Sequence, residues 1–259
     1  YFKGKKHLFE GLAMAELETE WKEHPVLHLD LNAEKYDKIE DLNNILDTFL
    51  REWEEEYGSS EGNNPSLSMR FRSVIRSAKQ KTGRGAVVLV DEYDKPILQA
   101  IGNEPLQDEF RNALKAFYGV LKSADADLRF TLLTGVTKFG KVSVFSDLNN
   151  LKDISTSPHF HDICGISEVE LHRFFDEQVE NLAIYNKQTK DEAYKELKRR
   201  YDGYHFCEDT DGLYNPFSLL WTLSENKYGN YWFATGTPTY LVELLKKNDF
   251  KLEEFSNLE

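Results

Sequence analysis

The pattern of apolar and polar positions along residues 25–134 alternates between strand and helix periods, in the order that builds a parallel sheet. Residues 86–90 form an uninterrupted apolar run, Ala-Val-Val-Leu-Val, which is typical of a strand buried on both faces. Residues 26–31 place leucines on one face and Val, His and Asp on the other, which predicts a strand near a sheet edge. A third strand is predicted at 128–134, after a helical stretch that would return the chain to the same sheet.

Helices are predicted between these strands. The stretches 37–57 and 105–121 each place their leucines and aromatic residues on a single stripe, and a further helix is expected at 67–81. Residues 1–24 also have an amphipathic pattern that ends before a proline, and we expect them to be helical. A short fourth strand is expected at 152–156.

The pattern changes after residue 165. Residues 167–170, Ser-Glu-Val-Glu, form a capping box, and the apolar residues behind them fall on one helical face. Another helix is predicted at 190–200, followed by a small hairpin within 203–214. We therefore expect two domains, an α/β core at 1–165 and a mostly helical, lid-like or winged-helix-like subdomain at 166–259. The aromatic residues expected to pack inside the second domain or against the first are Trp221, Tyr231, Trp232 and Phe233.

Composition describes an ordered globular protein. The 259 residues are 40% hydrophobic and 13% aromatic, enough to build a proper core, and no apolar run reaches membrane-spanning length. The two cysteines, Cys164 and Cys207, are too few and too distant for a disulfide framework, so we expect free thiols in a reducing cytoplasm. A formal net charge of -13 argues against nucleic acid as the default ligand, because a broad phosphate-binding surface is basic.

Two adjacent carboxylates follow the central strand directly. Asp91 and Glu92 come at its carboxyl end, where ligands bind in open α/β sheets. An apolar run followed by Asp-Glu has the form of a Walker B segment. In that role Asp91 would hold Mg²⁺ and Glu92 would polarise the water that attacks the γ-phosphate of ATP. The alternative is a buried strand that happens to end in a polar turn.

The strand at 128–134 leads into a second polar segment, which we expect beside Asp91 and Glu92. There Thr134 or Thr137 would be a hydroxyl partner of the γ-phosphate, and Lys138 would act as a charge clamp. The alternative is a solvated loop.

The same segment contains a match to the spacing of a phosphate-binding loop. Residues 135–141 read G-x-x-x-x-G-K, but Val142 follows where the loop needs a Ser or Thr hydroxyl for Mg²⁺. The match also comes after the Walker B strand, whereas a phosphate loop normally precedes it. We expect the true loop, with the first strand of the sheet, upstream of Tyr1.

Six motifs together carry a family resemblance. They are YFKGKKHLFEGL at 1–12, VVLVDEYDKPI at 87–97, LLTGVTKFGKVSVFSDLNNLKDIS at 132–155, YDGYHF at 201–206, LYNPFSLL at 213–220 and YWFATGTPTYLVELL at 231–245. In this order they resemble the bacterial AAA-ATPase-like family, whose members often carry a C-terminal PD-(D/E)XK-type nuclease domain. The resemblance implies a P-loop NTPase-like three-layer core with a mainly parallel sheet, and ATP and Mg²⁺ as ligands. It also implies that 132–155 is a sensor strand with its loop and that the C-terminal third is a lid.

These observations favour an ATP-hydrolysing domain that couples nucleotide state to an attached or bound effector, possibly a nuclease, and that could form a homo-oligomer. Without a Walker A loop, this stretch alone is expected to be inactive. The alternative is a scaffold module that keeps the fold but does not hydrolyse ATP. A metal-dependent nuclease built on Asp91, Glu92, Asp94 and Lys95 is disfavoured, because Tyr93 stands where an acid two residues before the lysine is needed.

Overall fold

The computed structural model describes residues 1–59, 65–136, 144, 148–207 and 210–232. The chain divides into two compact units, Tyr1–Leu151 and Lys152–Glu259. The first unit holds the sheet and the predicted site, and the second is helical. The domain boundary expected after residue 165 stays a prediction.

A three-stranded parallel sheet is the centre of the first unit. Its strands are β1 (Val26–Asp30), β2 (Ala86–Asp91) and β3 (Leu128–Leu133), in the order β1-β2-β3. The three predicted strands are therefore confirmed, with the apolar run in the centre and the alternating strand at an edge. All three strands end at the same edge of the sheet, as the crossover rule requires.

A one-residue irregularity lies at the start of the pairing between β2 and β3. Ala86 pairs with Leu128, but the next residue, Val87, pairs with Phe130, so Arg129 is an extra residue in β3. Gly85 leaves room for this bulge, since a Cβ on it would lie 2.9 Å from the backbone nitrogen of Arg129. From Val87 onward the two strands pair one to one.

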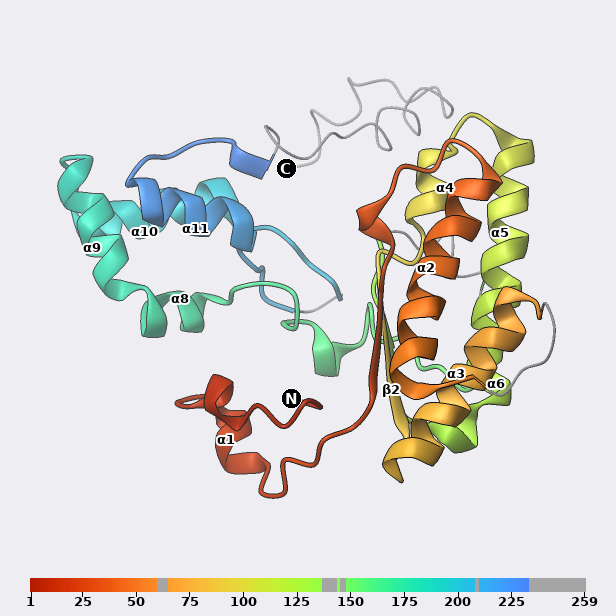
Figure 1. Ribbon diagram of the computed structural model, residues 1–259. Helices are drawn as coiled ribbons and strands as arrows, with labels where there is room; N and C mark the ends of the chain where they lie inside the picture. Colours follow the sequence, from red (N-terminus) through yellow and green to blue (C-terminus); the bar gives the residue numbers. More distant parts are fainter. Residues whose placement is uncertain (60–64, 137–143, 145–147, 208–209, 233–259) are drawn as a thin grey trace. The chain divides into compact units, whose positions relative to one another are not determined.

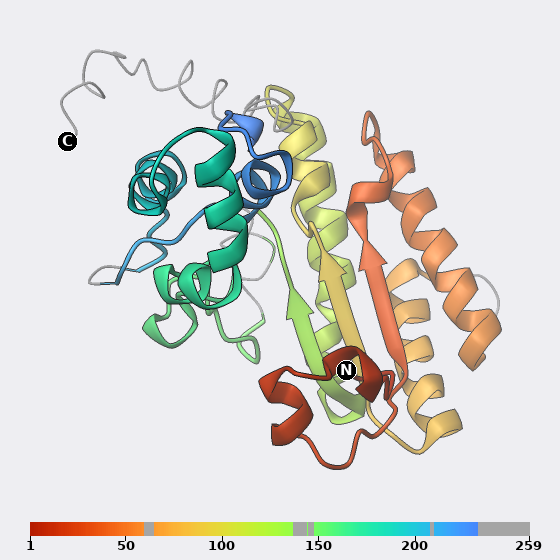
Figure 2. The ribbon, with the colours of Figure 1, turned by 90° about the vertical axis from the view of Figure 1, so that its left-hand side faces the viewer.

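Helices of the first unit cover one face of the sheet. In Figure 1 they lie on one side of β2, and in Figure 2 the strands stand in front of them. The helices are α2 (Ile39–Tyr57), α3 (Leu67–Thr82), α4 (Lys95–Gln99), α5 (Glu104–Tyr118) and α6 (Val120–Ser123). On the other side of the sheet, among the described residues of this unit, Figures 1 and 2 show only the N-terminal segment with the short η1 (Lys6–Phe9) and α1 (Ala13–Leu17), where the centroid of the Phe2 ring lies 5.3 Å from that of Phe130. The third layer of the expected three-layer core stays a prediction.

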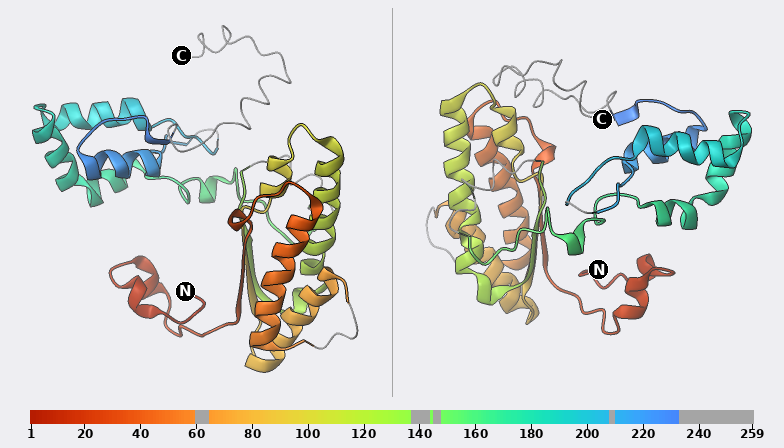
Figure 3. Two further views of the ribbon diagram at one scale, coloured as in Figure 1. Left: turned by 45° about the horizontal axis from the view of Figure 1, so that its top comes forward. Right: turned by 180° about the vertical axis from the view of Figure 1, so that it is seen from behind.

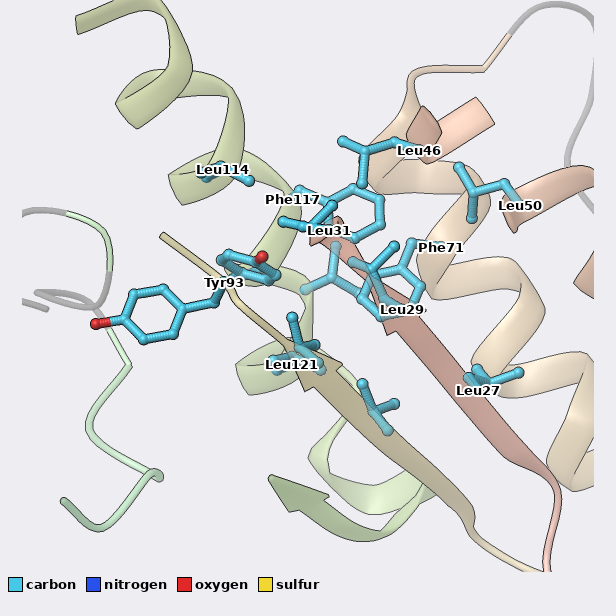
Figure 4. Close-up of a cluster of buried hydrophobic side chains, with 14 of the residues drawn as sticks. Leu27, Leu29, Leu31, Leu46, Leu50, Phe71, Tyr93, Leu114, Phe117 and Leu121 are labelled. Atoms are coloured by element: carbon cyan, nitrogen blue, oxygen red, sulfur yellow. The ribbon is translucent and has the colours of Figure 1, made fainter. Parts of the chain in front are cut away.

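The core of the first unit lies between the sheet and these helices. Leu27, Leu29 and Leu31 are at most 1% exposed. The alternation of β1 turns the first two toward the helices, and Leu31 begins the 3₁₀ helix η2 (Leu31–Ala33) that follows β1. Figure 4 shows them among leucine and phenylalanine side chains of the helical layer. At its centre the rings of Phe71 and Phe117 stack, with centroids 4.5 Å apart and planes 4° from parallel.

The expectation that residues 1–24 are helical is wrong for most of this segment. Only the 3₁₀ helix η1 (Lys6–Phe9) and α1 (Ala13–Leu17) are helical there. Gly4 and Gly11 adopt positive φ, as does Trp21 at φ 45°, and left-handed residues interrupt a right-handed helix.

The second unit is a helical cluster with its own core. Its elements are η4 (Pro158–Phe160), α8 (Glu168–Phe174), α9 (Asp176–Tyr185), α10 (Lys190–Tyr201) and α11 (Pro216–Glu225). Figure 3 shows the last three helices side by side. Ser167 caps α8 in the predicted capping box, and the predicted hairpin is present as an antiparallel bridge between Tyr204 and Leu213. A lid or winged-helix role for this unit stays a prediction.

The expectation of a fourth strand at 152–156 is wrong. Ser155 and Thr156 form a turn there, and Ser155 N donates to Asp153 Oδ1 at 2.9 Å. Trp221 is 46% exposed and is therefore not part of the core of the second unit, although its ring lies near those of Phe217 and Tyr231. Packing of Trp221 against the first unit stays a prediction. Phe233 lies outside the described residues.

Candidate functional site

The polar ends of the three strands meet on the sheet face opposite the helices α2–α6. Asp30 of β1 pairs with Asp91 of β2, and the β2–β3 register continues to place Thr134 beside Asp91. Residues two and four positions earlier form apolar or mixed rows on the same face. These rows are His28, Leu89 and Leu132, and then Val26, Val87 and Phe130. The site is thus the last row of the sheet, where the side chains change from apolar to polar.

Thr134 contacts Asp91 directly. Its Oγ1 donates to Asp91 Oδ1 at 2.5 Å, and its backbone nitrogen donates to the Val90 carbonyl at 2.9 Å. Its own carbonyl accepts from the Tyr93 nitrogen, also at 2.9 Å. The backbone ladder therefore extends one residue past β3 and fixes the hydroxyl against the carboxylate. The structure brings together these two residues, which the sequence places in one site.

Glu92 occupies an unusual backbone conformation. Its φ is +54°, in the left-handed region, and its carbonyl accepts from Lys95 N at 2.9 Å in the turn that starts α4. Such a φ in a residue other than glycine stores strain and is often found at functional sites. This turn leaves Asp91 exposed and Glu92 half-buried at the rim, while Tyr93 and Asp94 enter the interior.

The environment of Glu92 favours its neutral form. Desolvation by burial raises the pKa of its carboxyl group, and the nearby charges of Asp94, Asp91 and Asp30 raise it further, while Lys95 opposes them. A raised pKa makes a carboxylate a stronger base, which suits it to accept a proton.

Some residues near this edge carry polar contacts that the sequence alone did not bring into the site. Asp30 Oδ1 accepts from Asn32 N at 2.8 Å, and Asn32 Oδ1 accepts from Lys95 Nζ at 2.9 Å. This chain of contacts links the end of β1 to the start of α4. In the sequence, the position of Asp30 at the end of the alternating strand is a sign that it could join the site. Its pairing with Asp91 is seen only in the register of the two strands.

Asp94 and Gly135 lie behind Thr134. Asp94 is fully buried, and its Oδ1 accepts from the backbone nitrogen of Val136 at 3.1 Å. The remaining predicted residues of this segment, Thr137 and Lys138, lie outside the described residues, as do Gly140 and Lys141 of the loop-like match.

The acidic edge fits Mg²⁺ with phosphate ligands better than a closed metal cage. No group of three His, Cys, Asp or Glu side chains in the described part of the chain could hold a metal by itself. Mg²⁺ in nucleotide sites, however, keeps several waters and takes one or two carboxylates together with phosphate oxygens. Asp91 is exposed, and its Oδ2 accepts no hydrogen bond from the described residues, so this atom is available as a ligand.

The chain resembles known proteins over most of its length. Residues 1–145 match the sequence profile of a family described as predicted AAA-ATPase. A protein of Azotobacter chroococcum mcd 1, known as an uncharacterized protein in the vnfD 5′ region, is 36% identical over 244 residues. That match covers 94% of this chain and 45% of the relative, so the chain spans less than half the length of this curated relative.

No solved structure matches the chain. None of the described helices combines the length and the apolar character needed to cross a membrane. The family profile covers more than half of the residues, including all three strands and the acidic edge. The chain therefore belongs to the AAA-ATPase-like family.

Proposed function

We propose that the chain is the Walker B and sensor part of an ATP-hydrolysing domain. The observation that carries the proposal is the contact of Thr134 with Asp91 at the carboxyl edge of a parallel sheet, next to a carboxylate of raised pKa. Asp91 would hold Mg²⁺, Glu92 would accept the proton of the attacking water, and Thr134, Thr137 and Lys138 would contact the γ-phosphate.

Each of these roles follows from the chemistry of the side chain. Bound Mg²⁺ neutralises charge on the phosphate oxygens. Glu92 lies at the rim, where its carboxylate can orient a water molecule without also ligating the metal. The Thr134 hydroxyl donates to Asp91, so Oδ1 is held in place and Oδ2 is left for the metal. A second, cationic contact to the γ-phosphate is assigned to Lys138 by its position in the sequence.

The proposal includes a phosphate loop from a segment upstream of Tyr1. β3 pairs with β2 and with no other strand in the described part of the chain, so one edge of β3 is available for a further parallel strand. Phe130 and Leu132 are 40% and 38% exposed on the face opposite α2–α6, even though the Phe2 ring lies near Phe130. A strand and helix added there would cover these side chains and would deliver a loop to the edge that holds Asp91.

The role of the second unit and of partners is also a proposal. The family resemblance implies that an attached nuclease domain is the effector, and the relative is more than twice as long as its matched region, which leaves room for a further domain. Movement of the helical unit between nucleotide states would transmit hydrolysis to such an effector. A homo-oligomer and a cytoplasmic location complete the proposal, the latter from the two free thiols, Cys164 and Cys207.

Calorimetric titration with MgATP tests the central proposal. We expect no binding by this chain alone and micromolar or tighter binding by the natural protein that includes about 50 residues upstream, the length of a strand, loop and helix start. Asp91→Asn in the longer protein should weaken MgATP binding at least tenfold. The matched control is Asp108→Asn, an exposed carboxylate of α5 whose loss should change nothing.

The alternative, a scaffold that does not hydrolyse ATP, is favoured by the absence of a Gly-Lys-Ser/Thr sequence from the chain. Absence of MgATP binding by the longer protein would support it and would contradict the ATPase proposal. Binding by the short chain would instead return attention to the match at 135–141.

A further inference from the structure

We propose that Asp94 and Gly135 are positioning residues that hold the Thr134 hydroxyl against Asp91. This inference rests on the proposed ATPase function for its catalytic consequence. Its structural part, that the two residues fix the exit of β3 to the exit of β2, can be measured without nucleotide. Asp94 is fully buried and Gly135 has no side chain, so neither is assigned a side-chain contact with substrate.

Gly135 permits an approach that any other residue would prevent. A Cβ at this position would lie 2.5 Å from Tyr93 Cε1 and 2.6 Å from Asp94 Oδ1. Contacts below 3.0 Å do not occur for real Cβ atoms, and Tyr93 is only 2% exposed, so its ring has little space to move. Glycine is therefore needed here for steric reasons.

Asp94 supplies the matching polar contact. Its side chain is fully buried and accepts the backbone N–H of Val136 at 3.1 Å. This hydrogen bond is partly buried, and the Val136 N–H would lose its acceptor within the protein if the Asp94 carboxylate were removed. This hydrogen bond holds Val136, the residue after Gly135. In the same way, the hydrogen bond from Tyr93 N to the Thr134 carbonyl holds Thr134, the residue before Gly135.

Several contacts join the segment after β2 to the segment after β3, and we call this set of contacts the clamp. On one side are consecutive residues after β2, Tyr93 and Asp94, and on the other are Thr134, Gly135 and Val136 after β3. The left-handed φ of Glu92 makes this possible, because the turn sends Tyr93 and Asp94 inward while Asp91 stays at the rim. Since Tyr93 belongs to the main core, the clamp ties the position of the Thr134 hydroxyl to that core.

A change in the clamp should therefore reach the active site through one hydrogen bond. Gly135→Ala must move either the Tyr93 ring or the backbone of residues 134–136. Within residues 134–136, Thr134 is the one whose side chain contacts Asp91 in the described part of the chain. If the clamp acts through Thr134, removing the Thr134 hydroxyl first should make the clamp irrelevant to catalysis. Independent effects would instead multiply.

A double-mutant cycle in the longer natural protein tests the catalytic part. We expect Thr134→Val and Gly135→Ala each to lower kcat about tenfold, with a smaller change in KM, and the double variant to be no slower than the slower single variant. Leu50→Ala, in the buried face of α2, is the control for lost stability and should leave the kcat of the folded protein unchanged. Multiplied effects, or a kcat equal to wild type in Gly135→Ala, would overturn the inference.

Amide hydrogen exchange on the present chain tests the structural part. Asp94→Ala should speed exchange of the Val136 amide at least tenfold while β1 amides such as Leu29 keep their protection. Asp94→Asn retains a side-chain oxygen at the same place and should restore protection of Val136. An unchanged Val136 amide in Asp94→Ala would disprove the clamp. If the clamp is present but the wild-type longer protein hydrolyses no ATP, the proposed function fails and the structural inference stands.

Discussion

Arg70 of α3 holds Glu54 of α2 with two parallel hydrogen bonds, from Nε to Oε1 and from Nη2 to Oε2, both at 2.8 Å. Its remaining nitrogen, Nη1, donates to Asp47 Oδ1. The Arg70 side chain is only 14% exposed, and Glu54 is 20% exposed. The two long helices that cover the sheet are therefore joined by a partly desolvated ion pair with the fork geometry that arginine provides.

Replacing Arg70 with lysine should lower the free energy of unfolding by about 2 kcal/mol, because one ammonium cannot reproduce three directed hydrogen bonds in this partly buried position. Denaturant titration would measure the loss. Arg51→Lys is the matched control, since Arg51 pairs with the same Asp47 but is 71% exposed, and its replacement should cost less than about 0.5 kcal/mol. Equal losses for the two variants would contradict the prediction.

The same cluster predicts a dependence of stability on pH. The hydrogen bond from Arg70 lowers the pKa of Asp47 below its ordinary value. Asp47 therefore contributes stability that is fully present above the ordinary pKa of an aspartate and is lost as pH falls through its lowered pKa in the folded state. Asp47→Asn should remove this contribution, so the stability difference between wild type and variant should shrink as pH falls from about 6 to about 2. A difference that stays constant over this range would count against the assignment.

The stacked pair in the core predicts a large effect of volume loss. Phe117 is 1% exposed and lies flat against Phe71, so Phe117→Ala should destabilise the first unit by about 3–5 kcal/mol. Phe217 of α11 is 39% exposed, and Phe217→Ala should cost less than about 1 kcal/mol. Chemical denaturation followed by the fluorescence of Trp53, which packs on Phe71, would report the first unit. A loss below about 1 kcal/mol for Phe117→Ala would show that the observed packing is not the packing in solution.

Glu92 predicts a pH dependence of ATP hydrolysis in the longer protein. A general base acts when ionised, so the rate should fall as pH drops through the pKa of Glu92, which burial raises above that of an ordinary glutamate. Glu92→Gln should keep MgATP binding and lower kcat at least 100-fold. Glu52→Gln, on the exposed side of α2, is the matched control. Loss of binding together with hydrolysis in Glu92→Gln would show that Glu92 holds the metal or the fold instead.

The strands and long helices could be predicted because each has one dominant period. The apolar run at 86–90 can be buried only in the middle of a sheet, and the alternation at 26–31 suits an edge strand with one face packed. The helix α4 was not predicted, because its five residues, which include Pro96, are too few to show a helical period. Proline fits the first turn of a helix, where its missing N–H is not needed, and that is its place in α4.

The candidate site was predictable where it depends on strand ends and not where it depends on register or packing. Asp91, Glu92 and Thr134 follow strands directly, so their positions could be inferred from the crossover. Asp30 became part of the site only through its pairing with Asp91. The contact between Gly135 and Tyr93 depends on side-chain packing, which no local pattern encodes.

The extra residue in β3 has a consequence at the opposite end of the sheet. If the pairing of Ala86 with Leu128 continued one to one, Asp91 would stand opposite Leu133, an apolar side chain, and Thr134 would be displaced by one position. The extra residue Arg129 thus determines which residues of β3 lie opposite which residues of β2 along the rest of the strand. The Thr134 hydroxyl faces the Asp91 carboxylate because the pairing shifts by one residue beside Gly85, before the row that contains Val87 and Phe130.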